Sequence, residues 1–260
     1  MKIRMGLIGA TSTLLIFCIG LIFSSIKPLS CSERTDSAEA LLAEVDRNLT
    51  SETLKYHLVM EIIYSPGDQR TVEADVWAVG RDSVYLEYTA PARERGTRYL
   101  KIGKSLWIHQ PKLSRSVLIQ GHMLRQGVFG SDFSYEDMLE SGHLLDDYTA
   151  EFLPDEETLR VLKLTAKNDE VTYQQRILWI DEELKIPRRS ELRTRYGKPL
   201  KTVELDEIRA FGERLYPTRI VMKDLLKQKS STVMRIVDPI FDVRIDPQTF
   251  TRRHLERPLD

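Results

Sequence analysis

From Leu54 onward, the apolar residues of this chain recur at every second position. The first such run places its apolar residues on one face and polar residues such as His57 and Glu61 on the other. Its apolar members are Leu54, Tyr56, Leu58, Met60, Ile62 and Tyr64. Side chains alternate between the two faces of a strand, so this run predicts a half-buried β-strand. The turn signal Ser65-Pro66-Gly67-Asp68 follows, and similar runs over 72–78 and 84–88 predict an antiparallel meander.

Strand patterns of the same kind cover most of the remaining chain. They fall at 99–102, 106–108, 117–119, 148–153, 158–166, 172–180, 187–196, 200–210, 215–224 and 231–238. Many short strands with few helical segments predict a mainly β fold, built as one large curved antiparallel sheet or an open barrel. No linker rich in Pro, Gly or Ser divides this part, and no repeat is present. We therefore expect a single domain over residues 36–260.

Two segments show helical signals. Apolar residues at three- and four-residue steps predict an amphipathic helix over about 36–49, which would pack against the sheet. They are Ala38, Leu41, Leu42, Val45 and Leu49. A second, short helix is expected from Ser134, with Ser134 as its N-cap and Asp137 at the third position of a capping box.

The first thirty residues have the pattern of an export signal. Met1 to Arg4 is short and basic, and Met5 to Phe23 is almost wholly apolar. This run is also long enough to span a bilayer, so residues 1–30 are either a cleaved signal peptide or an uncleaved signal anchor. Ser30-Cys31 directly after the apolar run is similar to the lipobox of bacterial lipoproteins. That similarity favours cleavage and lipidation at Cys31, with residues 31–35 as a short tether.

Composition and cysteine content agree with an exported domain. Hydrophobic residues make up 42% and charged residues 30% of the chain, which is ordinary for a globular protein. The net charge is −1, without the basic excess that is typical of nucleic-acid binding. Of the two cysteines, Cys18 lies in the apolar segment and Cys31 alone remains after it. No intrachain disulfide is then possible in the mature part, and a lipidated sulfur explains Cys31 better than a free thiol in an oxidising compartment.

Three blocks between residues 96 and 137 carry a family resemblance. They are Gly96-Thr97-Arg98-Tyr99-Leu100-Lys101-Ile102, then Leu106-Trp107-Ile108-His109-Gln110-Pro111, then Gly130-Ser131-Asp132-Phe133-Ser134-Tyr135-Glu136-Asp137. Together they resemble the outer-membrane lipoprotein-sorting proteins, the LolA-like family. His109 departs from the pattern, which has an aromatic residue such as Tyr at that place. Weaker agreement extends to Pro247 and Phe250.

The resemblance implies a half-barrel: a curved antiparallel sheet of about eleven strands, closed on its concave side by helices around a cavity for acyl chains. Strict alternation, with the aliphatic side chains taken as facing inward, then gives a candidate cavity lining. Its members are Val84, Leu86, Tyr88, Leu100, Ile102, Leu106 and Ile108. From the residues alone, an ordinary filled core remains the alternative for the same set.

The sequence shows no recognisable catalytic machinery. It lacks a Gly-x-Ser-x-Gly elbow, a His-Glu-x-x-His helix and a phosphate-binding glycine loop, so we expect neither an enzyme nor a bound cofactor. His109, His122 and His143 do not have the spacing of metal ligands, and no metal site is predicted. Asp132, Glu136 and Asp137 could be imagined as an acid–base pair, but helix capping and the family motif explain them better.

Clustered arginines leave a further alternative open. Arg188, Arg189, Arg193 and Arg195, like Arg93, Arg95 and Arg98, would either meet anionic lipid head groups or lie on a solvated strand face beside the acidic segments.

The leading functional hypothesis is an acyl-chain-binding lipoprotein of the bacterial envelope. It would face the periplasm, be anchored through Cys31 or the N-terminal helix, and carry lipid or an acylated protein between membranes or to a membrane transporter. The alternatives are a lipid-sensing regulator and an adhesin-type structural lipoprotein whose interior is merely core.

Overall fold

The computed structural model describes residues 37–113, 115–140, 142–227 and 230–258. The expected signal segment, the lipidation site Cys31 and the tether at 31–35 lie outside the described residues. Within the described part, no helix is long and apolar enough to cross a membrane.

Thirteen strands are found among the described residues. They are β1 (Thr53–Ser65), β2 (Asp68–Val79), β3 (Ser83–Ala90), β4 (Arg98–Ile102), β5 (Ser105–His109), β6 (Val117–Ile119), β7 (Tyr148–Glu156), β8 (Leu159–Ala166), β9 (Gln175–Asp181), β10 (Ile186–Arg193), β11 (Pro199–Phe211), β12 (Arg214–Asp224) and β13 (Ser231–Phe241). The predicted strands of the second half agree with β7–β13 to within a few residues at each end.

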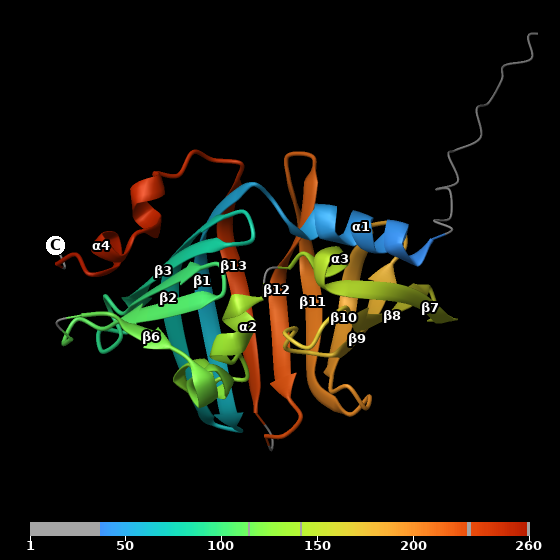
Figure 1. Cartoon of the computed structure of the whole chain (residues 1–260), viewed down its shortest axis with the longest axis horizontal. Coiled ribbons are helices and arrows are strands. Elements are labelled where there is room, and N and C mark those ends of the chain that lie inside the picture. The colour runs from blue at the N-terminus through green and yellow to red at the C-terminus, as the bar shows by residue number, and fades with distance from the viewer. Residues whose placement is uncertain (1–36, 114, 141, 228–229, 259–260) are drawn as a thin grey trace, which may run out of the picture. The chain divides into compact units, whose positions relative to one another are not determined.

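All thirteen strands belong to one antiparallel sheet, in the order β6-β5-β4-β3-β2-β1-β13-β12-β11-β10-β9-β8-β7. In the described residues β6 and β7 form its two edges, so the sheet does not close into a barrel. Figure 1 shows both edges lying nearer to the viewer than the central strands β1 and β13, which makes the sheet curved. The mainly β architecture expected from the period-two pattern is confirmed, with more strands than the family resemblance implied.

The helical elements are short except for the first. They are α1 (Ala38–Leu49), η1 (Gly121–Arg125), η2 (Val128–Gly130), α2 (Tyr135–Leu139), α3 (Leu144–Asp147), η3 (Pro247–Phe250) and α4 (Arg252–Leu255). The helix expected at 36–49 is confirmed, with Ser37 as its N-cap. The expected capping box of α2 is also present, because the Ser134 backbone N–H and hydroxyl both donate to the Asp137 carboxylate at the start of the helix.

The helices α1, α2 and α3 lie on one face of the sheet (Figure 1), and two separate clusters of buried apolar side chains lie on that face. The first, which we call the inner cluster, belongs to β1–β6. Its buried members are Leu58, Met60, Ile62, Val72, Ala74, Val76, Leu86, Tyr88, Tyr99, Leu106 and Ile119. The second lies between α1 and β7–β9 and includes Leu41, Leu42 and Leu162. The apolar stripe of α1 is fully used there, as expected for an amphipathic helix.

The opposite face of β3–β5 carries a third cluster, which we call the outer cluster. Tyr85 and Leu100 pack there against Leu255 of α4, with Trp77, Trp107 and Phe250 alongside. Arg98 fastens this C-terminal segment: its guanidinium, buried in the same face, donates to the carbonyl oxygens of Leu255 and Arg257 and pairs with Glu87 at 3.2 Å. The sheet is therefore covered on both faces at β3–β5.

Candidate functional site

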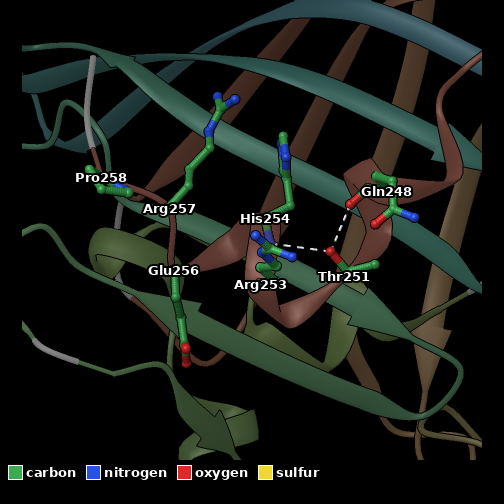
Figure 2. Close-up of a pocket in the computed structure, with 7 residues that line it drawn as sticks. All are labelled: Gln248, Thr251, Arg253, His254, Glu256, Arg257 and Pro258. Carbon is green, nitrogen blue, oxygen red and sulfur yellow. Dashed lines mark hydrogen bonds between the residues drawn. The ribbon is translucent and has the colours of Figure 1, made fainter.

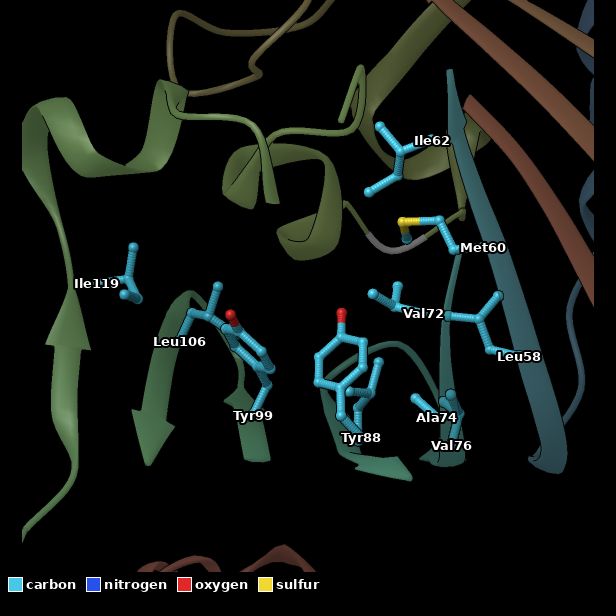
Figure 3. Close-up of a cluster of buried hydrophobic side chains, with 11 residues drawn as sticks. Leu58, Met60, Ile62, Val72, Ala74, Val76, Tyr88, Tyr99, Leu106 and Ile119 are labelled. Carbon is cyan, nitrogen blue, oxygen red and sulfur yellow. The ribbon is translucent and has the colours of Figure 1, made fainter. Parts of the chain in front are cut away.

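The inner cluster contains most of the side chains proposed to line a cavity. Leu86 and Tyr88 of β3 and Leu106 of β5 are buried members, and Val84 and Ile108 are packed against them. The strand register explains why they share a face, since Leu86 lies opposite Tyr99 of β4, and Tyr99 lies opposite Ile108. In Figure 3 the rings of Tyr88 and Tyr99 stand among the aliphatic members of this cluster.

Leu100 and Ile102 do not belong to that face, and their predicted inward placement was wrong. Leu100 is directly opposite Tyr85 and Trp107, and it is buried in the outer cluster under the C-terminal segment. Ile102, two residues further along β4, is 38% exposed. The side chains that β4 turns inward are Tyr99 and Lys101, because pairing with β3 and β5, not hydrophobicity, fixes which face is inner.

Residues 121–139, which we call the lid segment, pack apolar side chains onto the inner cluster. They are Met123, Leu124, Phe129, Tyr135, Met138 and Leu139. Phe129 meets Tyr88 edge-to-face with ring centroids 4.9 Å apart, and Tyr135 lies over Tyr99 at 5.9 Å. The Tyr64 hydroxyl donates to the Phe129 carbonyl at 2.8 Å. With the lid segment in this position, the face of β1–β5 is filled by side chains.

Asp132 of the family motif holds the lid segment to the β12–β13 hairpin. Its carboxylate is 1% exposed and accepts three hydrogen bonds: from the Asp224 backbone N–H (3.0 Å), the Ser230 hydroxyl (2.7 Å) and the Thr232 hydroxyl (2.8 Å). The Asp132 backbone N–H in turn donates to the Thr232 hydroxyl at 2.9 Å. Lys227 adds a further attachment by donating to the carbonyls of Gly130 and Ser131.

Asp137 makes a second set of attachments, toward β11 and the β8–β9 loop. It caps α2 through Ser134, receives the Tyr173 hydroxyl at 2.6 Å and pairs with the buried Lys201 ammonium. Asp132 and Asp137 are thus both fully engaged in holding the lid segment. Neither carboxylate is presented to a substrate in the manner that acid–base catalysis needs.

The other motif residues have packing roles. Phe133 packs against Tyr173, Leu192 and Met222, and the Ser131 hydroxyl donates to the Phe133 carbonyl at 3.1 Å. Gly130 has φ +77°, and a Cβ at that position would lie 3.3 Å from the Tyr64 ring, so the close approach of lid and β1 requires glycine. Trp107 lies in the outer cluster, and Pro111 is an exposed turn residue after β5.

A cavity of about 560 Å³ lies between the inner cluster and the α1 cluster. Its volume is in the range of about 300–1,000 Å³ that is typical of ligand sites. Leu124 and Leu139 of the lid segment line one side, and Leu144 and Val171 line the other. Charged groups from the β2–β3 turn, from β4 and the turn after it, from α2 and its C-terminal end, from α3, from the β8–β9 loop and from β9 complete its wall. They include Arg81, Lys101, Glu136, Glu140, Asp147 and Arg176.

Lys101 is the most unusual group in this wall. It is 3% exposed, and its ammonium donates to the carbonyl oxygens of Arg81 (2.9 Å) and Glu140 (3.5 Å), with no carboxylate in direct contact among the described residues. Desolvation by burial lowers its pKa, although nearby acids such as Asp82 oppose that shift. The Glu136 carboxyl in the same wall has its pKa raised, first by desolvation and then by the neighbouring Asp137.

Arg176, in contrast, is fully satisfied. It pairs with Glu140 and donates to the Tyr148 hydroxyl at 2.9 Å. Sequence reasoning missed both Lys101 and Arg176 as site residues, although Lys101 stands within the first motif block. Alternation assigns a lysine between two aliphatic residues to the solvent face, and only the strand register shows that it points inward.

A second hollow, of about 590 Å³, lies at the C-terminal segment. Figure 2 shows its lining residues, which all come from 248–258. Thr251 joins two of them, donating to the Gln248 carbonyl at 2.8 Å and accepting from the His254 N–H at 3.2 Å. This hollow is formed by a single chain segment, and no side chain from another described segment lines it.

The described residues bring no group of three metal-ligating side chains together. His109 is buried on β5 with its pKa lowered by desolvation, whereas His122 is exposed in η1 and His143 lines the cavity.

A single curved antiparallel sheet with helical segments on its apolar inner face is the LolA-like fold. A LolA superfamily protein from Nitrosomonas europaea is similar with a TM-score of 0.73 and 23% identity, covering 85% of this chain and 100% of that one. A putative outer membrane lipoprotein-sorting protein domain from Vibrio parahaemolyticus gives 0.73 and 18%, over 85% and 98%. A DUF1329 family protein from Desulfovibrio piger gives 0.74 and 20%, over 84% and 97%.

At this identity the solved structures establish the fold, and the resemblance read from the motif blocks is confirmed. The chain belongs to a family described as "Uncharacterized protein", whose model matches residues 80–257. No curated protein matches the sequence.

Proposed function

We propose that this protein binds acyl chains on the inner face of its sheet and carries a lipid or an acylated protein within the bacterial envelope. The observation that carries the proposal is the lid segment: its apolar side chains cover the inner cluster, yet polar groups of Asp132, Asp137 and Lys227 hold it in place. A segment fastened by a few polar contacts can be displaced as a unit. The cavity beside it would then be continuous with the uncovered apolar face.

The energetics permit such an exchange. Uncovering the apolar side chains of Phe129, Tyr135, Met138 and Leu139 costs about 6–12 kcal/mol, at about 1.5–3 kcal/mol for each side chain, and breaking the polar attachments of Asp132, Asp137 and Lys227 adds to this cost. An acyl chain of about 16 carbons recovers on the order of 12 kcal/mol, at about 0.8 kcal/mol per CH₂. An acyl chain therefore recovers an energy of the same order as the apolar contacts it replaces, and the polar attachments favour return of the lid segment when the cargo leaves.

The cavity suits the polar end of the ligand. Lys101 offers an ammonium that no carboxylate contacts within the described residues, and Glu136 faces the same space. A carboxylate or phosphate at the end of an acyl chain would satisfy the Lys101 charge and relieve part of its desolvation cost. No step of this function needs a catalytic group or a cofactor, so we propose a binding protein and not an enzyme.

The location is proposed on the same basis. The apolar segment at 5–23 and Ser30-Cys31 support export and attachment to a membrane. The likeness to a putative outer membrane lipoprotein-sorting domain supports a periplasm-facing position. A membrane lipid transporter is the partner that such a carrier would serve.

A second candidate is a structural envelope lipoprotein that binds nothing. The filled inner cluster, with Tyr88, Tyr99, Phe129 and Tyr135 packed on one another, favours it. In that case the lid segment is a permanent part of the core.

Two leucines on neighbouring strands distinguish these candidates. Leu106 is buried in the inner cluster and Leu100 in the outer cluster. Leu106→Ala and Leu100→Ala should each cost about 2–5 kcal/mol in the free energy of unfolding. Only Leu106→Ala enlarges the space beneath the lid segment, so it alone should bind a long-chain fluorescent fatty acid several-fold more tightly than wild type.

The full-length chain is used throughout, so binding to its N-terminal apolar segment is the same in all three proteins. Equal affinities for the two variants, or wild-type protein whose organic extract contains no lipid by mass spectrometry and which takes up no probe, would favour the structural lipoprotein.

A further inference from the structure

Two turns at one end of the sheet lie side by side and expose apolar side chains. The β10–β11 turn covers 194–198, and the β12–β13 turn follows Asp224, the last residue of β12. The Leu225 N–H donates to the Leu200 carbonyl at 2.8 Å, and Lys201 is paired with Asp224 in the register of β11 and β12. The two turns are thus fixed next to each other by backbone contacts.

The exposure of their apolar residues is exceptional for this chain. Tyr196 is 94% exposed, Leu226 66% and Leu225 47%, and these are three of the four most exposed large apolar side chains among the described residues. The fourth, Ile240 at 51%, lies near the other end of β13. Scattered exposed apolar residues are normal, but a cluster of them at adjacent turn tips marks an interaction surface.

The surrounding charge indicates which partner fits. Residues 194–198 and 223–227 contain Arg195, Lys198, Lys223 and Lys227 and one acid, Asp224, in a chain whose net charge is −1. Arg195 pairs with Asp169 and Lys223 with Glu204 at 3.7 Å. Lys227 donates only to carbonyl oxygens, and Lys198 makes no ion pair within the described residues, so both charges are left for an external anion.

We propose that residues 194–198 and 223–227 form a docking surface for an anionic phospholipid bilayer. Tyr196, Leu225 and Leu226 enter the interface between head groups and acyl chains, and Lys198 and Lys227 contact the lipid phosphates. The clustered arginines at 188–195 therefore have two different environments. Arg189 and Arg193 pair with Glu191 on the strand, whereas Arg195 lies in the docking turn.

Docking would bring the β12–β13 turn, whose residues hold the lid segment by hydrogen bonds, close to the bilayer surface. Asp224 and Ser230 hydrogen-bond Asp132, and Lys227 holds the carbonyls of Gly130 and Ser131. A lipid phosphate that attracts Lys227 competes with those carbonyls. Only this consequence rests on the proposed function, because docking itself does not require that the inner face bind an acyl chain.

The test is hydrogen exchange of the full-length chain reconstituted in vesicles. Peptides covering 194–200 and 223–227 should exchange several-fold more slowly in an equal mixture of phosphatidylcholine and phosphatidylglycerol than in phosphatidylcholine alone, and high salt should remove the difference. Attachment through the N-terminal segment is the same in both vesicles and cannot produce it. Leu226→Ser and Lys198→Gln should abolish this protection, whereas the matched variant Ile240→Ser should keep it.

The proposal is overturned if these peptides are equally exposed in both vesicles, or if Leu226→Ser protects as well as wild type. Protection that persists in detergent without lipid would show self-association through the turns and would also overturn it. Loss of fatty-acid uptake with docking intact would contradict the proposed function alone.

Discussion

Replacing Asp132 by asparagine should loosen the lid segment while leaving the sheet intact. The substitution keeps the shape of the side chain and removes its charge. Asp132 accepts hydrogen bonds from Asp224, Ser230 and Thr232, all of them on or next to the β12–β13 hairpin. No other carboxylate described in this structure joins the lid segment to that hairpin through three hydrogen bonds.

The magnitude follows from those three bonds. A hydrogen bond to a charged group contributes about 1.5–3 kcal/mol. The asparagine oxygen can still accept from Asp224 and Ser230, but as a neutral acceptor, and its amide nitrogen cannot accept from the Thr232 hydroxyl. We expect a loss of about 2–3 kcal/mol from the free energy of lid opening. That is a factor of about 30–150 in the population of the open state.

Hydrogen exchange measures that population directly. The amides of Val128 and Tyr135, which donate to carbonyls within the lid region, should exchange about 30–150-fold faster in Asp132→Asn. The core strands β8 and β9 should change far less. Asp206→Asn is a suitable control, because Asp206 is a partly exposed partner of Arg219 outside the lid segment.

Two results would refute the reasoning about Asp132. Equal acceleration in the lid segment and in β8–β9 would mean that Asp132 stabilises the whole fold, so that the lid does not open as a separate unit. No acceleration anywhere would mean that the hydrogen bonds of Asp132 do not limit opening.

Four further predictions concern other parts of the chain. Lys101→Met should leave the free energy of unfolding unchanged or raise it by about 1–2 kcal/mol, since it removes a desolvated charge, while weakening fatty-acid binding; a large loss of stability in chemical denaturation would contradict this. Hydrogen bonds from the Ser116 hydroxyl and N–H lower the pKa of Glu256 from its ordinary value of 4.5. Because the folded value is the lower one, this stabilisation is present above pH 4.5 and is lost as pH falls through the folded value, so exchange at 252–257 should rise selectively in acid. A chelator should leave Tm unchanged, and a drop of several degrees would reveal a metal site. Cys31→Ser should abolish labelling of the protein by a clickable fatty acid in cells, and equal labelling would favour an uncleaved anchor.

Most strands and the main helix could be predicted because a strand such as β1 alternates apolar with polar residues, and α1 has a single apolar stripe. In β1, the apolar alternation of Leu58, Met60 and Ile62 against His57 and Glu61 leaves one arrangement. The pairing of β1 with β13, in which Leu54 lies opposite Phe241, and the edge position of β6 are long-range facts that no local pattern contains. The roles of Asp132 and Lys227 are of the same kind, because their partners lie about ninety residues away.

Strand β4 shows where alternation alone fails. Its sequence offers aliphatic Leu100 and Ile102 on one face and Tyr99 and Lys101 on the other, and hydrophobicity assigns the aliphatic pair to the interior. The structure covers both faces, so Leu100 is buried beneath Leu255, while Tyr99 and Lys101 face inward. Register against β3 and β5 decides between two faces that are both buried, and register depends on residues outside the strand.

The position of Leu100 in the outer cluster reverses the effect that is expected of Leu100→Phe. If Leu100 lined a lipid cavity, Leu100→Phe would fill free volume and block an acyl chain at little cost in stability. Because Leu100 packs against Tyr85, Trp107 and Leu255, the larger ring should instead overpack the outer cluster, cost about 1–3 kcal/mol and loosen the C-terminal segment. Fatty-acid uptake should then be unchanged, since the inner face is untouched. Reduced uptake at unchanged stability would show that Leu100 does reach the ligand and that β4 turns its aliphatic face, not Tyr99 and Lys101, toward the interior.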